Sequence, residues 1–214
     1  LFEGRSLLDL PDREYRRLRG GDLAMIFQDP LSSLNPAFRV GDQIAEALLT
    51  HTYNKKDAAR RKAATLLADV GIPQAGDRAR DYPHQFSGGM RQRIIIAISL
   101  LADPAIIIAD EPTTALDVTI QAEIMDLLQQ LCETENMGLI LITHDLGVVA
   151  EIADTVAVMY AGKVVERGSV DDIFYRSAHP YTLGLKAAMP SNDPTLKQSL
   201  QPIEGSPPDL FSPP

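Results

Sequence analysis

The most informative stretch of the chain is Ile-Ile-Ile-Ala-Asp-Glu at residues 106–111. Its short apolar run predicts a central parallel strand that is covered on both faces. Ligands of open α/β sheets bind beyond the carboxyl ends of the strands, which is where Asp110 and Glu111 stand. Asp110 would hold Mg²⁺, which prefers a few carboxylates plus phosphate oxygens, and Glu111 would take a proton from an attacking water. The alternative is that Asp110 caps the next turn and Glu111 is solvated.

Two further apolar runs predict strands, at residues 22–27 and 139–142. The first ends at Gln28-Asp29-Pro30, because proline lacks a backbone donor and restricts the residue before it. We expect helices over most of residues 40–87, at 88–101, 120–131 and 146–153, a hairpin over 155–166, a short helix opened by a capping box from Ser169 to Asp172, and a strand-and-turn piece at 1–10. This order predicts an α/β fold with a mostly parallel sheet and a helical insertion.

Three other positions carry candidate chemistry. Ser87-Gly88-Gly89 opens a predicted helix, whose free N–H groups and dipole suit an anion, although Ser87 can equally be a plain N-cap. His144 follows the strand at 139–142 and would donate to a terminal phosphate; the alternative is a structural histidine. Gln28 would orient a water or contact Mg²⁺ through its neutral amide, or serve only as a turn residue before Pro30.

Composition narrows the function classes. The 214 residues are 45% apolar and 23% charged, ordinary values for a globular protein. The net charge of −9 argues against a nucleic-acid partner bound through its phosphates. The single cysteine, Cys132, excludes an internal disulfide and suits a reducing compartment. Leu1 is not an initiator Met and the last nine residues are rich in proline, so we expect the chain to be cut from something longer.

Taken together and in this order, these elements resemble the ATP-binding subunits of ABC transporters over nearly the whole chain. Gln28 resembles the Q-loop glutamine, residues 86–92 the LSGGQ signature with Phe86 for Leu and Met90 for Gln, residues 106–111 Walker B plus the catalytic glutamate, residues 115–117 the D-loop, and His144 the switch histidine. Residues 28–36, 110–117, 179–182 and 203–210 also resemble the oligopeptide/dipeptide/nickel importer branch.

One motif of the family is absent from the chain, the phosphate-binding Walker A loop G-x-x-x-x-G-K-[ST]. Among the 14 glycines only Gly71 and Gly76 have the required offset, and Asp77-Arg78 follow them. In the family this loop precedes the Q-loop. We therefore expect a partial P-loop NTPase nucleotide-binding domain of ABC type, in which the chain alone is inactive. The predicted segments are 1–30 (end of the N-terminal core with the Q-loop), 31–89 (helical subdomain), 90–168 (ATPase core) and 169–214 (truncated C-terminal extension).

The resemblance implies a mechanism and partners. Two such subunits, identical or different, would sandwich ATP and Mg²⁺ head to tail. The implied site residues are Glu111 and His144 for catalysis, Gln28, Ser87, Gly88 and Gly89 for nucleotide binding, Asp110 and Gln28 for the metal, and Asp117 for communication across the dimer. Transmembrane permease subunits would be direct partners and a substrate-binding protein an indirect one. The implied location is the cytoplasmic face of the bacterial inner membrane, as a peripheral protein.

The resemblance leaves three alternatives open. The chain can belong to a soluble, non-transport ABC-type ATPase, although residues 28–36 and 179–182 favour the importer branch. It can be a non-catalytic fragment or pseudo-subunit, because the Walker A loop is missing. Its cargo can be nickel rather than a peptide.

Overall fold

The computed structural model describes residues 1–51 and 55–189. They belong to two compact units, one formed by residues 1–142 and the other by the described residues from 143 to 189. The elements of the first unit are α1 (Asp12–Leu18), β1 (Leu23–Ile26), α2 (Pro30–Ser33), α3 (Val40–His51), α4 (Lys56–Asp69), α5 (Ala75–Arg78), the 3₁₀ turn η1 (Pro83–Gln85), α6 (Gly88–Ser99), β2 (Ile106–Asp110), α7 (Val118–Thr134) and β3 (Gly138–Ile142). Those of the second are α8 (Leu146–Ile152), β4 (Thr155–Tyr160), β5 (Lys163–Ser169), α9 (Val170–Tyr175) and α10 (Pro180–Ala187).

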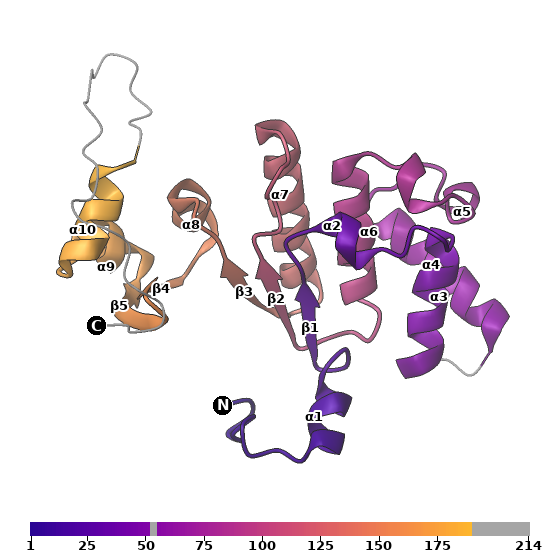
Figure 1. Cartoon of the computed structure of the whole chain (residues 1–214), viewed down its shortest axis with the longest axis horizontal. Helices are drawn as coiled ribbons and strands as arrows, with labels where there is room; N and C mark the ends of the chain where they lie inside the picture. Colours follow the sequence, from indigo (N-terminus) through magenta and orange to yellow (C-terminus); the bar gives the residue numbers. More distant parts are fainter. Residues whose placement is uncertain (52–54, 190–214) are drawn as a thin grey trace. The chain divides into compact units, whose positions relative to one another are not determined.

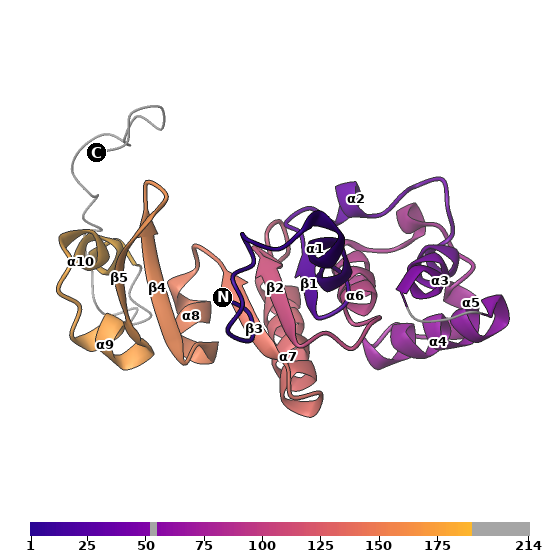
Figure 2. The same ribbon diagram turned by 90° about the horizontal axis from the view of Figure 1, so that it is seen from below.

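The first unit is built on a three-stranded parallel sheet in the order β1-β2-β3 (Figures 1 and 2). The register pairs Ala24 with Ile107 and Ile107 with Leu139. The predicted strands at 22–27, 105–109 and 139–142 are confirmed as β1, β2 and β3. Both crossovers advance in the same direction across the sheet and right-handed crossovers are the rule, so α6 and α7 lie on the same face.

That covered face forms the core of the unit. Ile26 and Ile107 are fully buried there, as are Ile96 of α6 and Ile124 of α7. Helix α6 starts polar and becomes apolar on all sides, a pattern that predicts a buried helix, and seven of its residues are buried. Because α6 also contacts α2, α3 and α4, it joins the sheet to the helical insertion.

The helical insertion consists of α3, α4, α5 and η1 and lies beside β1, on the side away from β3 (Figures 1 and 2). Helix α4 packs through Ala59, Ala63, Leu66 and Leu67. It ends at Asp69, and Gly71 follows with φ of +78°, the left-handed conformation that is typical of a glycine after a helix C-terminus. Because Gly71 turns the chain there, Ile72 also comes to lie in the interior.

Helix α1 was not predicted from the sequence. None of its residues is buried, so it lacks the apolar periodicity on which a helix prediction rests. The predicted strand-and-turn piece at 1–10 contains one antiparallel bridge between Phe2 and Arg5 and no strand.

The second unit contains the predicted hairpin, in which β4 pairs antiparallel with β5. Val156 and Val158 of β4 pack with Ile173 of α9 in a small core. The predicted capping box is present, because the Ser169 side chain accepts from the Asp172 N–H group. Residues 203–210 lie outside the described part of the chain. The four-segment subdivision predicted from the sequence stays a prediction.

Candidate functional site

The carboxyl edge of the parallel sheet brings together residues that are far apart in the sequence. Gln28 follows the end of β1 by two residues, and Asp110 is the last residue of β2. Glu111 comes next, and its N–H group donates to the Ile142 carbonyl at the end of β3 at 2.8 Å. Parallel pairing thus aligns three strand ends at one edge of the sheet. The predicted position of Asp110 and Glu111 at the C-terminal end of a central strand is confirmed.

Gln28 and Thr114 both donate hydrogen bonds to the Glu111 carboxylate. The Gln28 Nε2 atom donates to Glu111 Oε2 at 2.8 Å, and the Thr114 hydroxyl donates to the same oxygen at 2.7 Å. The first contact joins residues 83 positions apart. Hence the structure places Gln28 and Glu111 in direct contact. Thr114 was not singled out from the sequence, because a threonine in a turn has no distinguishing pattern.

The backbone around Glu111 is held in an uncommon conformation. Glu111 has φ of +45° and Ala115 has φ of +64°, both in the left-handed region that non-glycine residues seldom adopt. A turn between them is closed by the Thr114 N–H group, which donates to the Glu111 carbonyl at 3.1 Å. Strained positions of this kind cluster at functional sites and persist where the surroundings fix them.

The segment Ser87-Gly88-Gly89 opens α6. The Ser87 side chain accepts from the Met90 N–H group at 3.3 Å, so Ser87 is the N-cap of the helix. Both glycines lie close to the start of α7. A Cβ on Gly89 would lie 2.6 Å from Ile120 Cγ2, and one on Gly88 would lie 3.4 Å from Leu116 Cδ2. Glycine at position 89 is therefore required by helix packing, whatever else the segment binds.

Asp117 begins α7 as its N-cap. Its Oδ1 atom accepts from the Ile120 N–H group at 3.0 Å. The same Ile120 contacts Gly89, so the segment predicted to be the D-loop and the one predicted to be the signature pack together within the unit. His144 belongs to the second unit and is exposed.

The metal ligands predicted from the sequence are Asp110 and Gln28. Among the described residues no three histidine, cysteine, aspartate or glutamate side chains cluster closely enough to hold a metal. One carboxylate and one amide oxygen nevertheless fit Mg²⁺, which usually keeps several waters and takes its remaining ligands from substrate phosphates. Gln28 directs its Nε2 atom to Glu111, so its Oε1 atom is the one suited to a cation.

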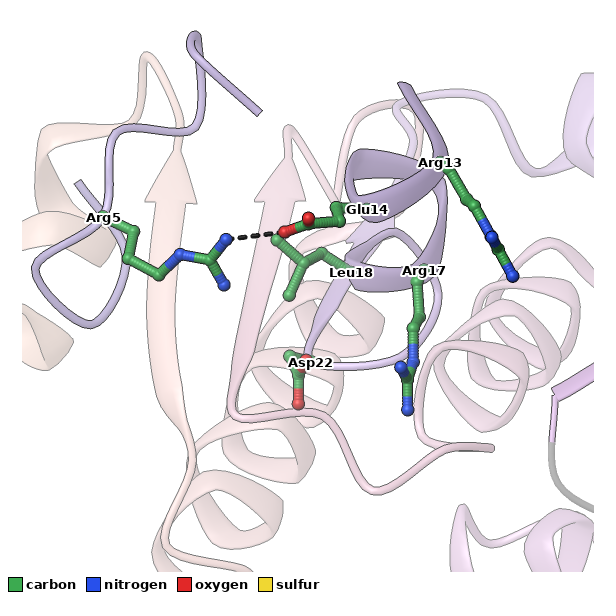
Figure 3. Close-up of a pocket in the computed structure, with 6 residues that line it drawn as sticks. All are labelled: Arg5, Arg13, Glu14, Arg17, Leu18 and Asp22. Atoms are coloured by element: carbon green, nitrogen blue, oxygen red, sulfur yellow. Dashed lines mark hydrogen bonds and ion pairs between the residues drawn. The ribbon is translucent and has the colours of Figure 1, made fainter. Parts of the chain in front are cut away.

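A pocket of about 530 Å³ lies at the other end of the sheet (Figure 3). It is lined by Arg5, Arg13, Glu14, Arg17, Leu18 and Asp22. Asp22 immediately precedes β1, whereas Gln28 follows it. Arg5 Nη2 contacts Glu14 Oε2 at 2.6 Å across the pocket. This pocket contains none of the predicted site residues and is separate from the carboxyl edge.

The described helices include none that combines the length and apolar character needed to span a membrane.

Family models match both ends of the chain. Residues 1–114 match the model described as ABC transporter. Residues 165–214 match the model described as oligopeptide/dipeptide transporter, C-terminal region. The second match covers the part of the chain that resembles the importer branch at 179–182 and 203–210.

Curated relatives are similar over the whole chain. The dipeptide transport ATP-binding protein DppD of Bacillus subtilis is 56% identical over 214 residues, which cover 64% of its length. The oligopeptide transport ATP-binding protein OppD of the same organism is 54% identical over 214 residues, or 60% of its length. The OppD protein of Escherichia coli is 50% identical over 98% of this chain and 62% of its own length. The chain thus spans somewhat less than two thirds of the relatives that it matches.

Solved structures agree with these matches. A dimeric ATP-binding cassette, MJ0796, bound to ADP and Pi, superposes with a TM-score of 0.65 at 28% identity, over 76% of this chain and 68% of that one. A second dimeric structure of the same cassette gives a TM-score of 0.65 at 29% identity. The predicted fold class, a partial P-loop NTPase domain of ABC type, is thereby confirmed, as is the resemblance to the oligopeptide/dipeptide branch. The chain belongs to the ABC transporter family.

Proposed function

We propose that this chain is part of the ATP-hydrolysing subunit of an ABC importer that powers the uptake of peptides. The observation that carries the proposal is the 50–56% identity, over 98–100% of the chain, to dipeptide and oligopeptide transport ATP-binding proteins. The match of residues 165–214 to the C-terminal region of oligopeptide/dipeptide transporters supports the same cargo class. It disfavours a soluble, non-transport ATPase.

The proposed chemistry is hydrolysis of ATP at the carboxyl edge of the sheet. Glu111 accepts the proton of the attacking water, and the hydrogen bonds from Gln28 and Thr114 help to hold its carboxylate. Asp110 and the Gln28 amide oxygen would hold Mg²⁺, which neutralises charge that develops on the phosphates. His144 donates to the terminal phosphate. Catalysis of this kind consists of positioning and electrostatic stabilisation.

The proposed assembly places two such subunits head to tail. Ser87, Gly88 and Gly89 of one subunit bind the nucleotide held by the other, and Asp117 transmits the state of one site to its neighbour. A dimeric cassette is the form in which the structural relative was solved. Transmembrane permease subunits would receive the helical insertion at the cytoplasmic face of the inner membrane, and a substrate-binding protein would deliver the cargo.

The 214 residues contain no Walker A loop, so we expect the chain alone to bind Mg-ATP weakly and to hydrolyse none. Isothermal titration of the chain with Mg-ATP tests this expectation. Low-micromolar affinity would show that the missing loop is not essential for binding.

The decisive experiment uses a completed chain, in which the Walker A segment of a relative is joined before Leu1. Glu111→Gln keeps the size and the hydrogen bonds but removes the proton acceptor. ATP binding should survive while hydrolysis falls roughly 10²–10⁴-fold, as is typical when a general base is lost. The uncleaved ATP should also hold two copies together as an ATP-dependent dimer. Hydrolysis at the parental rate would remove Glu111 from the role of base.

Asp110→Asn is the matched control, because it changes the neighbouring carboxylate in the same way. It should weaken Mg²⁺ retention, and with it nucleotide binding, which Glu111→Gln leaves intact. Cargo is tested separately in cells that lack their own peptide-importer ATPase, with labelled dipeptide, labelled oligopeptide and nickel supplied in turn. Uptake of nickel alone would replace the peptide assignment.

A further inference from the structure

The Thr114 hydroxyl contacts the carboxylate on which the proposed chemistry depends. It donates to Glu111 Oε2 at 2.7 Å from within the same turn. Gln28 Nε2 also donates to that oxygen, at 2.8 Å, from the end of β1, 83 residues away. Of these two donors, Thr114 shares the backbone turn of Glu111 and Gln28 does not.

The backbone turn from Glu111 to Thr114 fixes the geometry of the contact between their side chains. The Thr114 N–H group donates to the Glu111 carbonyl at 3.1 Å, and the Glu111 N–H group donates to the Ile142 carbonyl at 2.8 Å. These bonds fix the backbone of Glu111, whose φ of +45° needs such support. The terminal torsion of a glutamate has broad, roughly two-fold preferences, so the backbone alone does not fix the carboxylate plane. A hydroxyl group that donates to one carboxylate oxygen fixes the orientation of that plane.

The distant donor has a second task in the proposed function, because Gln28 is also a proposed ligand of Mg²⁺. In the sequence, Gln28 is followed closely by α2 and then by the helical insertion. Any displacement of that segment changes the Gln28 contact, whereas the contact from Thr114 moves with Glu111. The Thr114 hydroxyl is therefore a donor whose contact with Glu111 does not depend on the position of the Gln28 segment.

We propose that Thr114 is a positioning residue that holds the Glu111 carboxylate in its productive orientation. The proposal rests on the proposed function of Glu111. The effect requires a hydroxyl at position 114 and not a threonine as such, so serine should replace it. Thr113 is the matched control, because it is the same residue type, also half-buried, one position earlier in the turn.

The kinetic test compares Thr114→Val, Thr114→Ser and Thr113→Val in the completed chain. Thr114→Val should lower kcat about ten- to hundredfold, the range expected for a misoriented catalytic group, and leave KM for ATP unchanged. Thr114→Ser should restore most of kcat, and Thr113→Val should leave it at the parental value. Equal kcat values for the two valine variants, or failure of serine to rescue, would overturn the proposal.

Two outcomes of these measurements distinguish failure of this inference from failure of the proposed function. If Glu111→Gln hydrolyses ATP at the parental rate, the proposed function fails. If Glu111→Gln is impaired and Thr114→Val is not, only the role of Thr114 fails. In the double variant, Thr114→Val should cause no further loss beyond Glu111→Gln, since residues that act as a unit are not additive. A full additional loss would show that Thr114 acts elsewhere.

A measurement without turnover uses the 214-residue chain itself. The ¹³C resonance of the Glu111 carboxyl group should shift in Thr114→Val, because a donor to the carboxylate is lost, and should stay in place in Thr113→Val. Thr114→Ser should return it to the parental position. An unchanged resonance in Thr114→Val would contradict the hydrogen bond on which the proposal stands. The serine variant keeps the test decisive even if the valine variant folds poorly.

Discussion

The two faces of the parallel sheet are equally apolar but differently covered. On one face Ala24, Ile26, Ile107 and Ala109 are exposed by 5% or less. On the other face, Met25, Phe27, Ile140 and Ile142 are exposed by 40–53%. The covered face packs beneath α6 and α7, and in the described chain no helix covers the other face to the same degree (Figure 1).

The contrast shows what strand composition can and cannot tell. Parallel sheets are normally covered on both faces, so their strands are continuous apolar runs. Here the runs are continuous, yet only one face is buried. A contiguous exposed apolar patch of this kind marks a contact surface. The strands therefore have the composition of strands that are covered on both faces. The structure shows which of the two faces is covered by helices of this chain.

The largest effect should come from the covered face. Ile107→Ala removes a fully buried side chain and should lower the free energy of unfolding by about 2–5 kcal/mol, because it leaves a cavity. Ile140→Ala on the exposed face should cost about 1 kcal/mol or less, since half of that side chain is already in water. Urea unfolding followed by circular dichroism measures both. Equal losses would mean that the two faces are not differently covered in solution.

The second-largest change in the free energy of unfolding is expected where α6 and α7, the helices that cover the buried face, contact each other. Gly89→Ala places a Cβ 2.6 Å from the branched methyl group of Ile120, between α6 and α7. We expect a loss of about 1–3 kcal/mol, as for other overpacked interiors. Gly88→Ala is the matched control, because its Cβ would meet Leu116 at an ordinary 3.4 Å. It should be neutral or slightly stabilising. If the two variants unfold at the same urea concentration, the close contact of α6 with α7 is absent in solution.

The exposed face should govern self-association more than stability. Met25 of β1 and Ile140 of β3 both pair with Ile108 of β2, so the three side chains form one row across this face with Ile108 in the middle. Replacing both by threonine keeps strand propensity but makes the patch polar. Sedimentation of the 214-residue chain should show less self-association, while the free energy of unfolding stays within about 1 kcal/mol. Leu8→Thr changes an exposed leucine outside the sheet and should leave self-association as it was.

Sequence alone could predict the strands and the residues at their ends. Each strand is a short apolar run with a clear stop, as at Gln28-Asp29-Pro30, and parallel strands bring their ends to one edge. Thr114 escaped notice because its contact with Glu111 depends on a turn conformation, which no residue pattern encodes. Helix α1 could not be predicted because none of its residues is buried, so its sequence has no apolar periodicity. The unequal cover of the sheet could not be predicted, since both faces are largely apolar.

The smallest effect concerns the second unit, whose hairpin, like the parallel sheet, has buried and exposed apolar residues. Val156 and Val158 are buried against Ile173 of α9, whereas Met159 and Val164 are exposed. The covering helix α9 is held at its start by Asp172. The Ser169 hydroxyl donates to Asp172 Oδ2 at 2.7 Å, and Arg176 Nε donates to Oδ1 at 2.8 Å. The Ser169 hydroxyl first, and Arg176 second, hold the pKa of the Asp172 carboxyl below its usual value.

A lowered pKa in the folded chain has a defined sign for stability. Asp172 stabilises α9 at pH values above its unfolded pKa of about 3.9, and the contribution is lost as the pH falls through the lower pKa of the folded state. Asp172→Asn should therefore unfold the second unit more readily at neutral pH, and its deficit relative to the parent should shrink at acid pH. Methyl NMR signals of Val156 and Val158, followed through thermal unfolding at several pH values, report this unit alone. A deficit that stays constant from neutral to acid pH would mean that the charge of Asp172 does not hold α9 over the hairpin.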